Sequence, residues 1–287
     1  MTAATPVYAR RFVSLVKFEH TVFALPFAFV GAILSVGEVP AASTLFWVTV
    51  AMVGARSLAM ALNRLIDAEI DARNPRTAAR EIPAGLLTRA QVVLFCAASL
   101  AVFLVAVWQL DPLVRWLWPI PVAAFVVYPY LKRFTWLCHA GLGFASGMAP
   151  AGAWLAVTGD ASPEPFMLWA AVALWIGGFD VIYATTDVEF DRREGLHSLP
   201  ARFGIAAGLT VTRLCHVAAV GLLAAVGLSL GLGAPYFLGL SVVAVLLAYE
   251  NSIVHPDDLS RVNVAFFTLN GVISMVFLAG VLADVLI

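Results

Sequence analysis

Two stretches of the sequence carry polar side chains at a regular step of four residues. The first ladder is Asn63, Asp67 and Asp71, and the second ladder is Tyr183, Asp187 and Asp191. In a helix, this step places the side chains on one face at about 6 Å axial spacing. Two like charges four residues apart destabilise a helix unless something neutralises them, and hard oxygen ligands suit Mg²⁺, particularly Mg²⁺ shared with a phosphate. The ladders therefore predict a magnesium site that handles a phosphate-bearing substrate.

The sequence after each ladder also repeats. Basic residues come first, and a proline and a glycine follow: Arg73, Arg76, Arg80, Pro83 and Gly85 in one case, Arg192, Arg193, His197, Pro200 and Gly204 in the other. We interpret this as a weak internal repeat whose two halves face one another. A single pair of aspartates at a membrane boundary is usually a solvated helix end, but two ladders of the same step favour a functional site. Glu69 and Glu189 lie two residues off the ladders and are expected to face away.

Other polar residues lie within or at the ends of apolar segments. Arg56 precedes Asn63 by seven residues, so it is expected on the same face, two turns deeper. A buried arginine requires an anionic partner, which is either an internal carboxylate such as Asp180 or an anionic or phenolic group of a substrate. Tyr128 and Lys132 are again four residues apart. Lys132 is also explained by the bias of basic residues toward the cytoplasmic side of a membrane.

The composition limits which elements can position these residues. Of the 287 residues, 62% are hydrophobic and 12% are charged, whereas soluble domains carry about 25% charged residues. The chain is therefore expected to be an integral membrane protein. Its net charge of −1 argues against a nucleic-acid partner. The cysteines form no close pair, so neither a disulfide framework nor a zinc site is indicated, and the first nineteen residues contain no apolar run typical of a signal peptide.

Apolar segments long enough to cross roughly 30 Å of hydrocarbon recur along the chain. Seven are His20–Gly37, Val39–Ala55, Ala90–Leu110, Trp116–Leu131, Phe134–Gly159, Pro165–Phe179 and Val262–Ala283. The uncharged run Leu214–Tyr249 would measure about 54 Å as one helix, and a turn at Gly231–Pro235 divides it into two spans. We predict an all-α polytopic membrane protein with about nine transmembrane helices in one bundle, two pseudo-repeated halves facing a central cavity, and a single domain over residues 1–287.

The distribution of basic residues predicts the orientation. With nine spans and the N-terminus inside, nearly every lysine and arginine lies in the connections after the even-numbered spans or inside the second span, and Arg115 is the exception. The ladders then lie at the cytoplasmic ends of the second and sixth spans. We therefore expect the active site at the cytoplasmic ends of these two spans.

Three motifs together resemble those of the UbiA superfamily of intramembrane aromatic prenyltransferases, over nearly the whole chain. The similar stretches are Asn63–Asp71 continued through Arg76, Thr77, Arg80, Pro83 and Gly85; Asp180–Asp191 continued through Gly195, His197 and Ser198; and Tyr128–Thr135. Many members have Asp in place of Arg64 and Lys in place of His197. The segment Lys17–Pro26 is similar to a bacterial quinone-pathway branch of 4-hydroxybenzoate polyprenyltransferase-like members, some of which act on a dihydroxynaphthoate on the futalosine route to menaquinone.

The resemblance implies Mg²⁺-dependent transfer of a polyprenyl group from its diphosphate to a ring carbon of an aromatic acceptor, in ubiquinone or menaquinone biosynthesis. It implies Mg²⁺ ligands at Asn63, Asp67, Asp71, Asp187 and Asp191, with the four aspartates essential to catalysis; diphosphate contacts from Lys17, Arg76, Arg80, Tyr128, Lys132 and Tyr183; and acceptor contacts from Arg56 and Asp180. Asp191 and Asp180 are both candidate bases for the acceptor. The expected location is the bacterial cytoplasmic membrane, with the active-site loops on the cytoplasmic side.

A membrane transporter coupled to cations or protons is the alternative. Paired intramembrane carboxylates and weak internal repeats also mark such proteins. Their polar groups are expected near mid-membrane on broken helices, whereas the ladders here lie at the ends of their spans. The position of the ladders favours an interfacial active site.

Overall fold

The computed structural model describes residues 11–16 and 21–287, and eight helices in that part of the chain are long and apolar enough to cross a membrane. They are α3 (Ala42–Ile66), α5 (Arg89–Trp108), α6 with α7 (Val114–Leu117 and Pro119–Leu131), α8 (Cys138–Thr158), α9 (Pro163–Ala184), α12 (Ile205–Ser229), α13 (Ala234–Ser252), and the π-helix Val264–Leu269 continued by α14 (Asn270–Leu286). The apolar helix α2 (Thr21–Leu34) is shorter. Together they match the nine predicted segments in order, so the prediction of an all-α polytopic membrane protein is confirmed.

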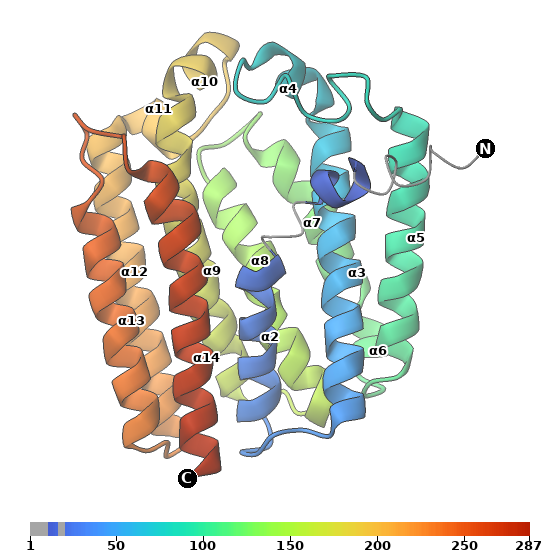
Figure 1. Cartoon of the computed structure of the whole chain (residues 1–287), viewed down its shortest axis with the longest axis vertical. Coiled ribbons are helices and arrows are strands. Elements are labelled where there is room, and N and C mark those ends of the chain that lie inside the picture. Colours follow the sequence, from blue (N-terminus) through green and yellow to red (C-terminus); the bar gives the residue numbers. More distant parts are fainter. Residues whose placement is uncertain (1–10, 17–20) are drawn as a thin grey trace.

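Helix α2 lies in the middle of the bundle between two groups of helices (Figure 1). It packs against α8, α14 and α3. The first group contains α3, α5, α7 and α8, and the second contains α9, α12, α13 and α14. Helices α8 and α9 pack along each other and join the groups. The halves predicted from the repeat thus correspond to two helix groups, while a cavity between them stays a prediction.

Small residues allow the central helices to approach closely. A side chain on Gly143 of α8 would overlap the carbonyl oxygen of Ala173 in α9, and one on Gly31 of α2 would overlap the carbonyl oxygen of Pro150 in α8. Within a bilayer, lipid tails are as apolar as leucine, so helices associate through such close backbone packing rather than through the hydrophobic effect. These contacts hold α2, α8 and α9 together as the centre of the bundle.

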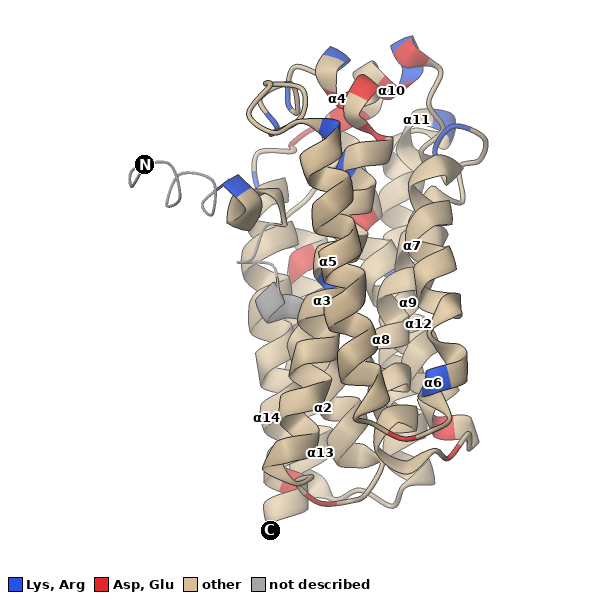
Figure 2. Ribbon diagram, turned by 90° about the vertical axis from the view of Figure 1, so that its right-hand side faces the viewer, with Lys and Arg blue, Asp and Glu red and all other residues tan. Residues whose placement is uncertain are grey.

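The connections divide the charges unevenly between the two ends of the bundle. The short helices α4 (Ala68–Arg73), η2 (Thr185–Asp187), α10 (Val188–Glu194) and α11 (Leu199–Phe203) follow α3 and α9. Figure 2 shows most of the charged residues gathered at the end where α4, α10 and α11 lie. At the opposite end, the predicted turn between α12 and α13 is confirmed, with Gly231 in the left-handed conformation at φ 65°. Both ladders therefore reach the same end of the molecule.

Candidate active site at the charged end of the bundle

Asp67 of the first ladder is buried and surrounded by donors. Its carboxylate accepts hydrogen bonds from Lys132 Nζ at 2.7 Å and from Asn63 Nδ2 at 3.1 Å, and Arg133 Nη2 lies 3.5 Å from its other oxygen. Only 1% of Asp67 is exposed. Because a carboxylate removed from water needs both counter-charge and hydrogen bonds, these three side chains make its burial possible. The Tyr128–Thr135 motif thereby meets the first ladder through Lys132 and Arg133.

Asp71 is held within its own half of the molecule. Arg80 Nη1 lies 2.7 and 2.8 Å from the two carboxylate oxygens of Asp71, and the aspartate is 4% exposed. The hydroxyl of Thr77 donates to the backbone carbonyl of Asp71 at 3.1 Å. The connection after α4 therefore folds back onto the ladder, which brings its basic residues to the carboxylates.

The second ladder is joined to the first by Arg76. Its Nε donates to Asp187 Oδ1 at 2.9 Å, its Nη2 contacts the other oxygen of Asp187, and its Nη1 donates to the hydroxyl of Tyr183 at 2.8 Å. Burial lowers the pKa of Arg76, but the hydrogen bond and charge of Asp187 outweigh it and hold that pKa above its usual value. Asn74 Nδ2 also donates to Asp187, at 3.1 Å. The two ladders thus face one another, as the repeat predicted.

Neither ladder is one continuous helical stripe, and this corrects the sequence-based expectation. Helix α3 ends at Ile66, and Asp67 has φ −92° and ψ 2° before α4 begins. The guanidinium of Arg133 donates to the carbonyl oxygen of Ile66 at 2.7 Å, at the point where α3 ends. The second ladder breaks at the corresponding residue, Asp187, with φ −109° and ψ 4°.

Two threonines lie at the break in the second ladder. Their hydroxyls bond back to the preceding turn, Thr185 Oγ1 to the carbonyl of Ile182 at 2.7 Å and Thr186 Oγ1 to that of Tyr183 at 2.8 Å. Such bonds compete with the regular helical pattern and here accompany the 3₁₀ turn η2. Each central aspartate consequently lies at a helix junction, where its carboxylate is accessible to groups beyond its own helix.

Asp180 has a partner that the sequence analysis missed. His139 Nδ1 lies 2.7 Å from Asp180 Oδ2, and the backbone N–H of Leu199 donates to His139 Nε2 at 3.3 Å. Since Nε2 accepts, the ring proton lies on Nδ1 and is donated to Asp180. Among the ion pairs of the described residues, Asp180 pairs with His139 and not with Arg56, which was one of the two interpretations of Arg56. The available signal was an ionisable residue within an apolar span, which is costly unless it has a partner.

Two arginines of α3 face inward without such a partner. The Nε atoms of Arg56 and Arg64 are buried and have no hydrogen-bond partner among residues 11–16 and 21–287. Arg64, at the position where the resembling family often has Asp, is only 5% exposed. The second interpretation of Arg56, contact with an anionic or phenolic group of a substrate, stays a prediction.

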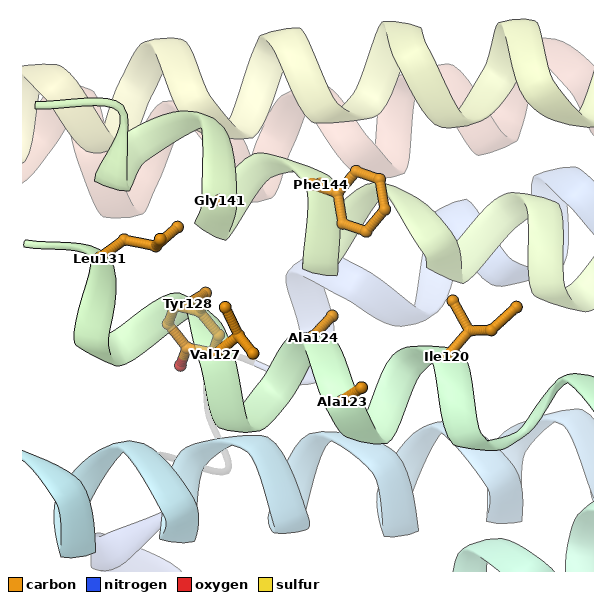
Figure 3. A pocket seen from close by; sticks show the side chains of 8 residues that line it. All are labelled: Ile120, Ala123, Ala124, Val127, Tyr128, Leu131, Gly141 and Phe144. Carbon is orange, nitrogen blue, oxygen red and sulfur yellow. The ribbon is translucent and has the colours of Figure 1, made fainter. Parts of the chain in front are cut away.

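Asp191 and Tyr128 lie at the edges of this arrangement. Ser198 Oγ donates to Asp191 Oδ2 at 2.7 Å, which ties α10 to the start of α11. Tyr128 is one turn before Lys132 in α7, and its ring lines an apolar pocket of about 520 Å³ between α7 and α8. Figure 3 shows the hydroxyl of Tyr128 on the side away from Gly141 and Phe144 of this pocket. Lys17, the remaining predicted diphosphate contact, lies outside the described residues.

Three of the predicted metal ligands each contact a predicted diphosphate-binding residue: Asp67 with Lys132, Asp71 with Arg80, and Asp187 with Arg76. Among the described residues, no group of three or more His, Cys, Asp or Glu side chains is arranged to hold a metal alone. Mg²⁺ commonly binds one or two carboxylates together with substrate phosphates and water. The oxygen donors here fit a metal shared with a substrate, rather than a metal caged by the protein.

Comparisons with known proteins identify the family of this chain. The model of the "UbiA prenyltransferase family" matches residues 24–272. A 4-hydroxybenzoate octaprenyltransferase of Aromatoleum aromaticum is 31% identical over 224 residues, which cover 78% of this chain and 76% of that protein.

Two solved structures share the fold. An apo structure of a UbiA homolog from Aeropyrum pernix K1 superposes with a TM-score of 0.84 at 34% identity, over 93% of this chain and 98% of that one. A UbiA homolog from Archaeoglobus fulgidus, bound to DMAPP and Mg²⁺, has a TM-score of 0.73 at 19% identity, over 96% of this chain and 99% of that one. From the match to the family model and the 31% identity, we conclude that this chain is a prenyltransferase of the UbiA family.

Proposed function

We propose that this enzyme transfers a polyprenyl group from a prenyl diphosphate to a ring carbon of a hydroxybenzoate or dihydroxynaphthoate, with Mg²⁺, in quinone biosynthesis. The observation that carries the proposal is the bridge from Arg76 to Asp187 and Tyr183, which joins the two ladders at one end of the bundle. The Aromatoleum relative is named for 4-hydroxybenzoate, and the Archaeoglobus homolog binds DMAPP and Mg²⁺. Both names support the same reaction class.

The charge pairs suggest how the substrate is received. In the structure, Lys132, Arg80 and Arg76 neutralise Asp67, Asp71 and Asp187. A diphosphate carries the charge that these basic residues bind, and Arg76 presents several N–H donors at once, the geometry that suits phosphate oxygens. Binding would therefore exchange partners, with the basic side chains moving to the diphosphate and the carboxylates becoming free.

The side-chain oxygens of Asn63, Asp67, Asp71, Asp187 and Asp191 are the groups that would hold Mg²⁺, and the exchange would free those of Asp67, Asp71 and Asp187 from their cations. The metal, when bound, supplies positive charge that stabilises the departing diphosphate. The protein's own cations, Arg76, Arg80 and Lys132, act in the same direction from the other side of the leaving group. Because the site lies at the end of a membrane bundle, the apolar prenyl tail can extend among the helices while its charged end stays among the ladders.

The acceptor is proposed to bind between Arg56 and Asp180. Arg56 offers an unpaired Nε to an acceptor carboxylate or phenolic oxygen. The hydrogen bond with His139 Nδ1 orients the carboxylate of Asp180, which is one candidate base for the proton that the acceptor loses. Asp191, bonded to the Ser198 hydroxyl, is the second candidate base. We place the enzyme in the bacterial cytoplasmic membrane with this charged end on the cytoplasmic side, from the distribution of basic residues.

The test is an assay with membranes that contain the protein. Geranyl and longer prenyl diphosphates are supplied with MgCl₂ and a panel of hydroxybenzoates and dihydroxynaphthoates, and products are identified by mass spectrometry. We expect a prenylated acceptor that disappears when EDTA replaces MgCl₂. Transfer that persists without a divalent metal, or no transfer to any acceptor, would contradict the proposal.

A further inference from the structure

A second buried polar cluster lies in the other helix group, away from the charge pairs. Glu250 of α13, Asn270 of α14 and Trp175 of α9 are 0%, 3% and 1% exposed. In the described part of the chain, no basic side chain forms an ion pair with Glu250. Burying polar side chains within membrane spans costs free energy. A cluster of them where three helices meet is therefore expected to have a structural or functional role.

Asn270 is the centre of this cluster. Its Oδ1 accepts a hydrogen bond from Trp175 Nε1 at 2.6 Å, and its Nδ2 donates to Glu250 Oε1 at 3.3 Å. Nδ2 also lies 3.0 Å from the carbonyl oxygen of Ala265 and 3.3 Å from that of Phe266. The amide orientation is therefore determined on both sides, because only the nitrogen can donate and only the oxygen can accept.

The two carbonyls belong to the π-helix Val264–Leu269. The wider turn of a π-helix changes which backbone N–H each carbonyl faces, so a side-chain donor can stabilise the altered register. Asn270 lies directly after this segment and supplies that donor. Glu250 and Trp175 in turn hold the amide of Asn270 in place.

The π-helix carries an aromatic side chain to the candidate active site. The ring of Phe266 stacks on that of Tyr183 with centroids 4.3 Å apart and planes at 28°, and it meets Phe179 edge-on at 5.1 Å. Tyr183 accepts the hydrogen bond of Arg76, whose guanidinium also lies 4.9 Å from the centre of the tyrosine ring. A chain of contacts through Phe266 and Tyr183 thus connects the buried cluster with Arg76, the residue that joins the two ladders.

We propose that Glu250, Asn270 and Trp175 are positioning residues for the diphosphate site. They hold the π-helix in the register that stacks Phe266 on Tyr183, and Tyr183 in turn orients the guanidinium of Arg76. The ligand that this device serves is the diphosphate end of the prenyl donor, so the inference rests on the proposed function. The cluster touches neither donor nor acceptor and acts only through Phe266 and Tyr183.

The test measures binding of geranyl diphosphate with MgCl₂ by equilibrium dialysis, on detergent-solubilised protein. Asn270→Ala and Glu250→Ala are expected to weaken binding about five- to tenfold, the loss expected when one hydrogen-bonded aromatic contact is misplaced. Glu250→Gln keeps an oxygen acceptor for Asn270 and should bind as the unaltered protein does. Ser274→Ala is the matched control, because Ser274 is fully buried in α14 and, among the described residues, its hydroxyl donates to the backbone carbonyl of Gly271 within the same helix.

Two additional measurements separate positioning from a general loss of structure. The KM for the acceptor should stay unchanged while the KM for the donor rises. Phe266→Leu leaves the polar cluster intact and should give the same donor defect, which keeps the test informative if Asn270→Ala does not fold. The double variant Phe266→Leu/Tyr183→Phe should lose less donor-binding free energy than the sum of the losses in the two single variants.

The outcomes also separate this inference from the proposed function. If the unaltered protein binds geranyl diphosphate and the Asn270, Glu250 and Phe266 variants bind it equally well, the positioning role is overturned and the proposed function stands. If Glu250→Gln is as damaging as Glu250→Ala, the carboxylic acid itself is required and positioning by hydrogen bonding is wrong. If the unaltered protein neither binds nor transfers the prenyl donor, both proposals fail.

Discussion

In the first ladder, both aspartates contact cations from their own half of the molecule, whereas the second ladder obtains its cation from the other half. Asp67 and Asp71 pair with Lys132 and Arg80. Asp187 pairs with Arg76, which follows the first ladder in sequence. The two sets share a step of four residues but differ in where their counter-charge originates.

This difference gives the two ladders different roles. The first ladder is neutralised as soon as its own helix group folds, since α3, α7 and the connection after α4 supply every partner. The second ladder is complete only when both groups meet. Asp191 contacts no cation in the described part of the chain and accepts only the hydroxyl of Ser198. The second ladder therefore retains the less neutralised carboxylate, which suits it for a metal or a proton from the acceptor.

The largest predicted effects come from the central aspartates. Asp67→Ala and Asp187→Ala should each reduce prenyl transfer about a thousandfold or more, because each removes a carboxylate at the proposed metal and diphosphate site. The two variants should differ in stability, since Asp67 is more buried than Asp187 and has two basic neighbours. We expect Asp67→Ala to lower the free energy of unfolding by about 1–3 kcal/mol, discounted for the partial exposure of its partners.

Activity by mass spectrometry and thermal unfolding in detergent measure these two effects separately. If both substitutions lowered the free energy of unfolding equally, the proposed difference in how the two ladders are neutralised would be wrong. Glu69→Ala is the control, since Glu69 is exposed and pairs at the surface with Arg89.

A smaller effect is expected when the bridge between the halves is removed. Arg76→Gln should raise the KM for the prenyl diphosphate about a hundredfold, because it removes the positive charge and the directed N–H donors that are proposed to move from Asp187 to the diphosphate. Arg76→Lys restores the charge but not the several directed donors, so it should recover only part of the affinity. Arg80→Gln is the comparison within one half. A larger defect for Arg80→Gln than for Arg76→Gln would show that the bridge between the ladders is not the dominant contact.

The smallest effect concerns Ser198. Ser198→Ala removes the hydrogen bond to Asp191 and should reduce kcat about tenfold, the lower end of the range expected for one hydrogen bond to a charged group. Glu189→Gln changes an exposed carboxylate of the same helix and should leave kcat unchanged. Steady-state kinetics with both substrates in excess provide the measurement. An unchanged kcat in Ser198→Ala would indicate that Asp191 is correctly placed without its neighbour.

The sequence predicted the elements of this protein more fully than the contacts between them. The spans were readable because crossing a bilayer requires a long apolar helix, and the turn at Gly231 was readable because one helix cannot accommodate the whole of Leu214–Tyr249. The ladders were readable because a step of four is a local property of a helix. The breaks at Asp67 and Asp187 were not, since a step of four residues does not show where a helix is interrupted; in the structure the guanidinium of Arg133 and the hydroxyls of Thr185 and Thr186 bind backbone carbonyls beside them.

The sequence by itself determined that this is a polytopic membrane protein with two sets of oxygen ligands and basic residues beside each. Only the tertiary structure decided which charges meet, that Arg76 reaches Asp187 across 111 positions and that Asp180 pairs with His139 rather than Arg56. The physical reason is that a helical period follows from local backbone geometry, whereas the partner of a buried charge depends on which helices pack together. In an apolar bundle the cost of an unpaired charge is high, so packing and pairing are decided together.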